Sequence, residues 1–521
     1  MANRSTDILF QLIRSLQKSE KRNFKLYTKR NSGNQDLKMV ELFDAIDNLD
    51  EYDETVLLKK VPSIKKQQLS NAKAHLYRQL LASLRVLKST ESIDMQLHEQ
   101  LDYAKILYNK GLHLQSLKIL ERAKELAKSH NQDTLLMQVI SMEKKIESLH
   151  ITRSMQNRAD ELAEEALDVN IRRRMITRLS NLALKLYSWY VQHGHARDRE
   201  DEKDIRKYFQ ENMPEGAYEK TGFYERMYLY QSYCWFAFIR QDFLMYYRYT
   251  QKWVDLFHDN PMMIEVETAH YIKGMHNLMN AHFDLRNYQQ FAKTLKQFEA
   301  FSETPVANVH ETHRIHTFVY LNSAKLNLEM IVGNFSAGLV IAPSIEEKLK
   351  EYSMFLDFHR ILVFNYKIAT LHFGAGNYEK SIDYLRRIIN DQVDLRSDLQ
   401  CYARLVHLLA HYELGNHDII EHLTKSVYRF MAKMKNLTVI EEEVFKFLRK
   451  SFSVSRSELK TELEKFLANI KKYEKDRYAT RAFSYLDLVS WVESKLYNKT
   501  MSQIIREKYL ASNRRITYGT L

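Results

Sequence analysis

The stretch ATLHFGAGNYEKSIDYL (residues 369–385) contains the pattern that decides the fold of this chain. Helix-forming residues lead up to Gly376-Asn377, an aromatic residue follows at Tyr378, and helix-forming residues continue after it. Glycine and asparagine tolerate the positive φ that a tight turn at a helix end requires. Ala369 and Ser381 are small, so we expect the two helices to approach most closely there. The stretch therefore predicts a helix, a tight turn and a second, antiparallel helix.

The same pattern recurs along the chain. Predicted turns near residues 241, 286, 333, 376 and 415 are separated by 45, 47, 43 and 39 residues. Repetition at intervals of this size is typical of helical-repeat proteins. The copies are Gly111-Leu112-His113, Gln241-Asp242-Phe243, Arg286-Asn287-Tyr288, Gly333-Asn334-Phe335 and Gly415-Asn416-His417.

A Gly-Asn/Asp-Tyr/Phe turn followed by a small Ala or Ser resembles the core pattern of the tetratricopeptide repeat (TPR) family, over about residues 95–435. The resemblance implies stacked helix pairs that form a right-handed solenoid with a concave recognition surface. The family period is 34 residues, so the longer intervals here predict longer helices or longer connections. We expect an all-α fold, an irregular TPR-like α-solenoid with non-repeat helical N- and C-terminal regions.

Length and composition agree with an extended helical fold. A chain of 521 residues exceeds the roughly 250–300 residues that one hydrophobic core usually serves. Only 12 glycines and 5 prolines are present, which favours long helices with short turns. The two cysteines, Cys234 and Cys401, predict small buried side chains rather than a disulfide framework or a metal site. No signal-like or membrane-spanning apolar run is present, so we expect a cytoplasmic protein without membrane insertion.

Three regions are predicted. Residues 1–90 form a basic helical N-terminal head, residues 91–436 the TPR-like repeats, and residues 437–521 a basic helical C-terminal cap. The tail from about Ser512 is expected to be mobile.

The N-terminal region is conspicuously basic. Residues 18–30 hold six basic residues and one acid, interleaved with Phe24 and Tyr27, and residues 59–88 hold eight basic residues and no acid. A long helix from about Ile64 to Lys88 is predicted, with an apolar stripe on one side and nothing that neutralises the charge on the other. Both a solvated surface and a docking site for an anionic partner, such as nucleic acid or an acidic protein, are open interpretations. The candidate patch is Lys65, Lys66, Lys73, Arg78, Arg85 and Lys88.

An aromatic stretch between Phe223 and Phe257 contains fourteen aromatic residues with interspersed arginines. Two packed helices can bury only about half of such a set. Core packing, an aromatic-lined peptide groove and stacking with unpaired nucleotides are the open interpretations. The candidate partner groove is Tyr224, Arg226, Tyr228, Trp235, Arg240, Tyr247 and Trp253.

Catalytic and cofactor patterns are weak. His407 and His411 share a helix face but have no third ligand at a recognisable spacing, and no glycine-rich phosphate loop occurs. We expect no catalytic residues, no cofactor, no metal and no small-molecule ligand. The leading hypothesis is a cytoplasmic, non-enzymatic scaffold or adaptor that binds a protein partner through the aromatic- and Arg-lined repeat groove. The alternative is an RNA- or ribosome-associated factor, less so a DNA-binding one, that docks on phosphate through its basic N-terminal helices.

Overall fold

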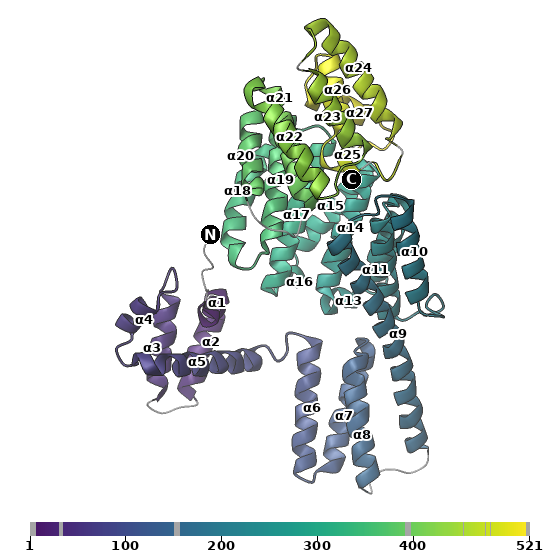
Figure 1. Ribbon diagram of the computed structural model, residues 1–521. Coiled ribbons are helices and arrows are strands. Elements are labelled where there is room, and N and C mark those ends of the chain that lie inside the picture. The colour runs from purple at the N-terminus through teal and green to yellow at the C-terminus, as the bar shows by residue number, and fades with distance from the viewer. Residues whose placement is uncertain are drawn as a thin grey trace. The chain divides into compact units, whose positions relative to one another are not determined.

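The computed structural model describes residues 7–30, 35–150, 157–390, 397–451, 453–474, 476–479 and 481–516 (Figure 1). Within these residues the fold is entirely helical, with 27 α-helices, one short 3-10 helix and no β-strand. The predicted all-α fold class is confirmed. Among the described residues, no helix combines the length and the apolar content needed to cross a membrane.

The chain divides into two compact units, Met1–Ile171 and Arg172–Leu521. One helix, α9 (Arg158–His193), runs across the boundary. In the second unit a single hydrophobic cluster extends from Phe223 to Tyr509. The finer boundaries predicted at residues 90/91 and 436/437 stay predictions, and this cluster is continuous across the second of them.

The first five helices enclose a hydrophobic core of their own. The rings of Phe24 and Phe43 lie 5.0 Å apart, and Leu76 is fully buried. Asp7 and Asp53 accept hydrogen bonds from the first-turn N–H groups of the helices that follow them, as good N-caps do. These helices are α1 (Ile8–Ser15), α2 (Lys18–Arg30), α3 (Gln35–Asp47), α4 (Glu54–Lys60) and α5 (Lys66–Leu87).

Three helices of equal length follow in the first unit and pack against the first part of α9. They are α6 (Ile93–Asn109), α7 (His113–Ser129) and α8 (Asp133–Leu149). The ammonium group of Lys124 on α7 contacts Glu143 on α8 and lies 2.7 Å from Glu165 on α9. The paired charges join three neighbouring helices of this group.

The second unit consists of helix hairpins and the short helices between them. The helices up to the middle of the unit are α10 (Arg199–Asn212), α11 (Phe223–Ile239), α12 (Phe243–His258), α13 (Met262–Val266), α14 (Thr268–Asp284), α15 (Tyr288–Ser302), α16 (Pro305–Asn308), α17 (Glu311–Ile331) and α18 (Phe335–Glu351). After the 3-10 helix η1 (Tyr352–Met354) come α19 (Phe358–Gly374), α20 (Tyr378–Ile389), α21 (Ser397–Glu413), α22 (His417–Lys433), α23 (Val439–Ser451), α24 (Arg456–Lys472), α25 (Arg481–Tyr485), α26 (Leu488–Leu496) and α27 (Met501–Ala511).

The hairpin turns share one backbone geometry. One residue adopts a positive φ, and the N–H of the next residue donates to a carbonyl five positions earlier. The six turns predicted from the sequence are confirmed in this form, with positive φ at Gly111, Gln241, Arg286, Gly333, Gly376 and Gly415. Asn131 and Lys435 form the same turn although no glycine marks their positions.

The predicted close approach of paired helices is also confirmed. The hydroxyl of Ser381 donates to the carbonyl of Ala369 at 2.8 Å, and both residues are fully buried. The first unit repeats this contact at the same separation in sequence, where Ser116 donates to the carbonyl of Ala104 at 2.8 Å. A small residue at this position lets the helix backbones approach closely enough for a side chain to reach a main-chain carbonyl.

The long intervals between turns have two structural causes. The paired helices α14, α15, α17 and α18 are 17, 15, 21 and 17 residues long. The connections between successive hairpins add the short helices α13, α16 and η1. Longer helices and longer connections, the two expected causes, therefore both occur.

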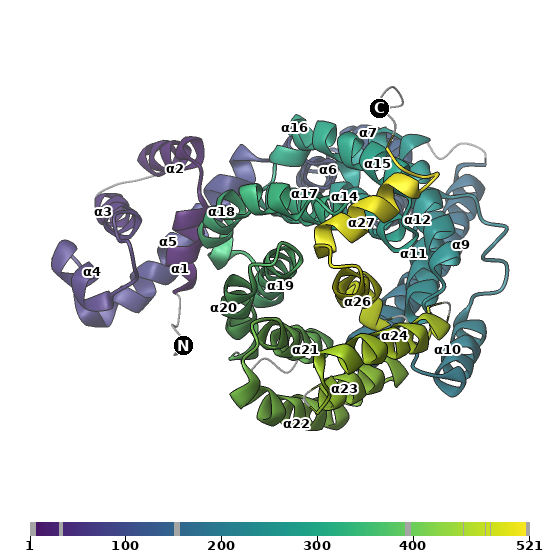
Figure 2. The ribbon, with the colours of Figure 1, turned by 90° about the horizontal axis from the view of Figure 1, so that it is seen from above.

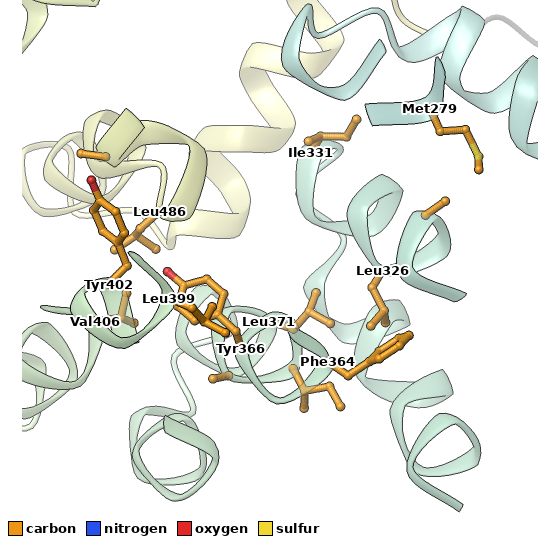
Figure 3. Packing of buried hydrophobic residues seen from close by; sticks show 14 of the residues in the cluster. Met279, Leu326, Ile331, Phe364, Tyr366, Leu371, Leu399, Tyr402, Val406 and Leu486 are labelled. Carbon is orange, nitrogen blue, oxygen red and sulfur yellow. The ribbon is translucent and has the colours of Figure 1, made fainter. Parts of the chain in front are cut away.

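The described residues between 476 and 516 form a C-terminal segment that folds back over the inner side of the hairpin row. Figure 2 shows α26 inside the curve that α17 to α24 follow. Trp491 on α26 is 1% exposed, and its indole N–H donates to Glu413 on α21 at 2.6 Å. The ring of Tyr485 stacks on Tyr402 with 4.0 Å between their centres, and Leu486 lies beside Tyr402 in the core (Figure 3). These buried contacts make the segment part of the core.

The end of this segment contacts two hairpin turns. The Ser502 hydroxyl donates to the carbonyl of Gly333 at 2.6 Å, and the Arg514 carbonyl accepts a hydrogen bond from the N–H of Gln289 at 3.0 Å. Arg514 also donates to the carbonyl of Leu285 at 3.1 Å. Residues 512–516 were expected to begin a mobile tail but are held against the α14–α15 turn, and residues 517–521 lie outside the described residues.

Two glycine turns allow a test of this packing. Gly333 and Gly376 have φ values of +74° and +82°, so alanine is strained by about 1–2 kcal/mol at either position. A Cβ at Gly333 would also lie 2.8 Å from backbone atoms of Ser502 and Arg506, whereas a Cβ at Gly376 would meet nothing within 4 Å. We expect Gly333→Ala to lose roughly 1–3 kcal/mol more stability than Gly376→Ala in denaturant unfolding. Equal losses would show that α27 does not rest on this turn.

Candidate functional site

The seven residues predicted to line a partner groove lie in different environments. Arg240 and Trp253 are 6% and 3% exposed, so their predicted role as surface anchors is corrected. Trp253 packs beneath α14, where a Cβ at Gly274 would lie 3.4 Å from the indole nitrogen. The remaining residues of the set, Tyr224, Arg226, Tyr228, Trp235 and Tyr247, are all partly buried.

Tyr224 and Tyr228 are the two predicted groove residues that contact a common polar group. The Tyr224 hydroxyl donates to Glu267 at 2.7 Å, and the other oxygen of Glu267 lies 2.8 Å from Nδ1 of His270. The ring of Tyr228 stands edge-on to His270 at 6.0 Å. This cluster joins the starts of α11 and α14.

The other half-buried groove residues point elsewhere. Trp235 lies against Tyr187 on α9, with ring centres 4.9 Å apart, and Tyr247 lies 5.3 Å from His282. Arg226 is about 200° around α11 from Tyr224 and therefore lies on a different face. The structure does not gather the seven residues into one groove.

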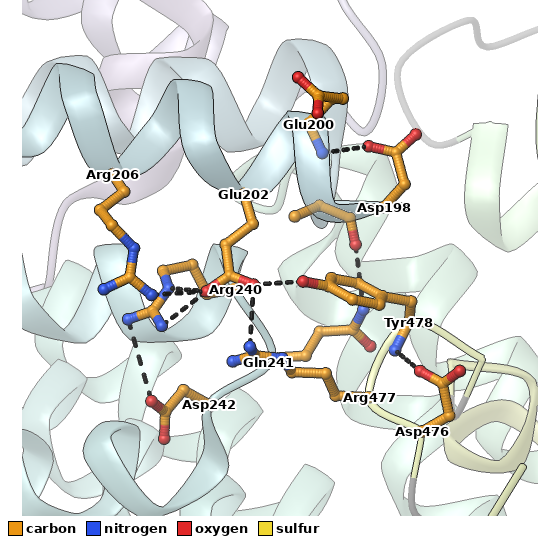
Figure 4. Close-up of polar contacts among 11 residues, drawn as sticks. Asp198, Glu200, Glu202, Arg206, Arg240, Gln241, Asp242, Asp476, Arg477 and Tyr478 are labelled. Carbon is orange, nitrogen blue, oxygen red and sulfur yellow. Dashed lines mark hydrogen bonds and ion pairs between the residues drawn. The ribbon is translucent and has the colours of Figure 1, made fainter.

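Arg240 belongs to a buried ionic network centred on Glu202 of α10 (Figure 4). Two guanidinium nitrogens of Arg240 donate to one Glu202 oxygen at 3.0 and 2.7 Å, and Arg206 donates to the same oxygen at 2.8 Å. The other oxygen accepts hydrogen bonds from Arg477, at 2.8 Å, and from the hydroxyl of Tyr478. The network therefore ties α10 and the end of α11 to the C-terminal segment.

The environment of Glu202 strongly favours its charged form. Burial alone would raise the pKa of Glu202, but hydrogen bonds from Tyr478, Arg240 and Arg206 outweigh it. The pKa falls to about 2, from an ordinary value of 4.5. The carboxylate is thus ionised at neutral pH and fully occupied by its donors, which is the chemistry of a structural clamp.

The basic patch predicted on α5 is partly neutralised. Lys73 contacts Asp7 and donates to the Tyr52 hydroxyl at 2.7 Å, and Arg85 lies 2.6 Å from Asp102. Lys88 lies 3.0 Å from both Glu20 and Glu91. The expectation that nothing neutralises this helix was wrong, because the acids come from other segments of the first unit. Lys65, Lys66 and Arg78 are the exposed members of the patch that make no ion pair among the described residues, whereas Arg85 is exposed but paired.

A second basic surface, which the sequence analysis did not single out as a site, follows α2. The residues Glu20, Phe24 and Thr28 turn inward and are 9%, 1% and 3% exposed. Five basic residues of α2 therefore share the outer side, at spacings of three, one, three and four residues. Together they line a recess of about 500 Å³, formed by Lys18, Lys21, Arg22, Lys25, Leu26, Lys29 and Asp47.

The recess carries a net positive charge. Lys21 pairs with Asp47 at 2.5 Å, and Lys25 pairs with Asp44 at 2.6 Å. Lys18, Arg22 and Lys29 are exposed and make no ion pair with any residue that the structure describes. The composition of residues 18–30 already indicated a basic segment, but only the fold shows that Glu20 faces inward toward Lys88.

The histidine and cysteine residues considered as metal ligands lie in helix-packing environments. Within the described ranges, no group of three or more His, Cys, Asp or Glu side chains is arranged to hold a metal ion. The rings of His407 and His411 lie 4.6 Å apart. Cys234 and Cys401 are 2% and 0% exposed, which confirms the prediction that both are buried.

The Glu202 network gives a pH-dependent prediction. Glu202→Ala leaves Arg240 buried without its partner, so we expect a loss of roughly 3–5 kcal/mol at pH 7. Glu200→Ala is the matched control on the same helix, because that side chain is 77% exposed and its pair contributes at most about 1 kcal/mol.

The pKa of Glu202 is lowered by folding, so its contribution is complete above about pH 4.5 and is lost as the pH falls toward 2. Denaturant unfolding between pH 7 and pH 2 should show this loss in the unsubstituted chain and not in Glu202→Ala. A Glu202→Ala chain as stable as Glu200→Ala would contradict the network.

Comparison with known proteins does not identify a family. No protein-family model matches the chain, and no curated protein matches its sequence. The resemblance to TPR proteins therefore stays a prediction from the turn pattern, and the functional argument depends on the geometry of the basic and aromatic surfaces.

Proposed function

We propose that the chain is a cytoplasmic, non-enzymatic scaffold with an irregular TPR-like α-solenoid that docks on the phosphate backbone of RNA through the outer face of α2. The observation that carries this proposal is the positively charged recess on that face. Three of its cations, Lys18, Arg22 and Lys29, are exposed and have no ion pair among the described residues.

The spacing of the charges supports a polyanionic partner. Positions three or four residues apart on a helix are separated by about 4.5–6 Å along its axis, so the α2 cations form a row about 16 Å long. A row of this kind binds phosphates by releasing their counterions, without reading bases. A recess favours a single strand over a duplex, whose phosphates lie on a broad convex surface. Single-stranded RNA segments are therefore the proposed target.

Charge reversal on α2 tests the proposal. The chain with Lys18→Glu, Arg22→Glu and Lys29→Glu should bind single-stranded RNA at least about 10-fold more weakly at 50 mM salt. The slope of log Kobs against log salt should be about 2 less negative for this variant. Each phosphate contact to a single strand contributes about −0.7 to the slope, and three contacts are lost. The measurement is fluorescence anisotropy with labelled RNA at several salt concentrations.

The matched control carries Lys65→Glu, Lys66→Glu and Arg78→Glu, the exposed residues of the α5 patch that make no ion pair among the described residues. It changes net charge by the same amount and should keep most of the affinity. Equal weakening of both triple variants would show non-specific attraction and would contradict docking through α2. Binding to anionic vesicles rather than RNA would point to a membrane surface.

A second function, binding of a protein partner, is favoured by Tyr224 and Tyr228. These half-buried aromatic side chains lie side by side near Glu267 and His270, and aromatic residues of this kind dominate binding hot spots. The C-terminal segment covers part of the inner side of the hairpins, so the surface available to a partner is narrower than the predicted groove.

The protein-partner function has its own test. Tyr228→Ala should abolish capture of a nuclease-resistant partner from native cells and leave the RNA affinity unchanged. Leu244→Ala is the control, because Leu244 is 61% exposed on α12. If the Tyr228→Ala chain captured the protein partner as well as the Leu244→Ala chain does, the protein-partner function would be contradicted.

A further inference from the structure

A separate group of cations surrounds Tyr320 in the second unit. The ammonium of Lys273 on α14 lies 5.4 Å from the centre of the Tyr320 ring, and the guanidinium carbon of Arg360 on α19 lies 5.1 Å from it. His276 stacks on the ring at 4.0 Å, and His316 lies at 6.1 Å. Three helices therefore contribute basic groups to one place.

The charges in this group are not balanced. Asp357 pairs with Arg360 at 2.7 Å, whereas Lys273 and Lys367 make no ion pair with any described residue. Lys367 donates instead to the side-chain oxygen of Asn327 on α17. Its charge acts on His276, the ring stacked on Tyr320, together with the charges of Lys273 and Arg360. Three cations and one carboxylate leave a net charge of about two positive units at pH 7.

The surplus positive charge and the burial of these side chains both shift the pKa values of the titratable groups in the cluster. Burial would raise the pKa of Tyr320, yet Lys273 and Arg360 lower it. Burial lowers the pKa of Lys367 to about 8. Burial, then the charges of Arg360, His313 and Lys273, lower the pKa of His316 to about 4, so this ring is neutral at pH 7 and can donate through one nitrogen.

Unsatisfied polar atoms lie on the same face of α17 as Tyr320. The Thr317 hydroxyl is in a side chain 4% exposed, and it has no hydrogen-bond partner among the described residues. Nδ1 of His313, a half-buried residue, is also buried and has no hydrogen-bond partner among the described residues. Buried polar atoms without partners, and half-buried cations without counter-charges, cost free energy that a bound anion would offset.

We propose that Lys273, Arg360 and Lys367, the cations near Tyr320 and His276, bind the phosphate group of a ligand. A phosphate carries about two negative charges at neutral pH, which matches the surplus of the cluster. Guanidinium and ammonium groups form short, charge-assisted hydrogen bonds to its oxygens. The basic side chains stay partly exposed, so a ligand reaches them from solvent. This site is independent of the α2 recess.

Thermal unfolding with phosphate is the first test. In 10 mM sodium phosphate at pH 7.5, Tm should rise by about 3 °C or more over sodium chloride of equal ionic strength. Lys367→Met should abolish this rise, and its Tm in chloride should be no lower than that of the unsubstituted chain, because an unpaired buried charge is removed. Lys296→Met, an exposed lysine on α15, should keep the rise.

Calorimetry then identifies the source of the phosphate. Lys367→Met should weaken binding of inorganic phosphate at least about 10-fold. A nucleoside monophosphate and a phosphoserine peptide are the two further arms, and whichever binds more tightly than inorganic phosphate gives the ligand class. The triple charge reversal on α2 should leave all three affinities unchanged.

Two results would overturn the proposal. The first is equal Tm in phosphate and chloride for the unsubstituted chain. The second is a Lys367→Met chain that is less stable in chloride and still responds to phosphate, which would make Lys367 a structural residue that supports Asn327.

Discussion

Burial of Trp491 against α21 is the interaction on which the arrangement of the second unit depends. A row of helix hairpins leaves an inner apolar side that must be covered, because exposed apolar surface opposes folding. Here the chain covers it with its own C-terminal segment, in which Trp491 is 1% exposed and donates to Glu413. Stacking of Tyr485 on Tyr402 extends the same cover. The inner side of the hairpins is thus occupied in part by the protein itself.

The two charged centres of the second unit differ in how completely they are balanced. Glu202 is surrounded by donors from α10, α11 and the C-terminal segment, so its charge is compensated and its role is structural. Around Tyr320 the cations outnumber the carboxylates, and among the described residues the one hydrogen-bond partner of Lys367 is the side-chain amide of Asn327. The same physics, the cost of a buried charge, therefore indicates a clamp in one place and a binding site for an anion in the other.

The sequence predicted much of the fold and little of the site, for physical reasons. Local chemistry determines a turn, so the glycine turns such as Gly376 were found, whereas Asn131 and Lys435 reach positive φ without a glycine pattern. Contacts distant in sequence leave no local signal. The acids that neutralise Lys73 and Arg85 lie on other segments, and the return of α26 to α21 depends on packing that forms only in the folded chain.

The claim that the C-terminal segment is a permanent part of the core can be measured directly by hydrogen exchange of the intact chain. If α26 covers the hairpins as the structure indicates, its backbone amides, those of Leu488–Leu496, will exchange as slowly as the amides of α19 and α21. Exchange of these amides within seconds, with α19 and α21 still protected, would contradict the account. It would show that α26 leaves the inner side of the hairpins open.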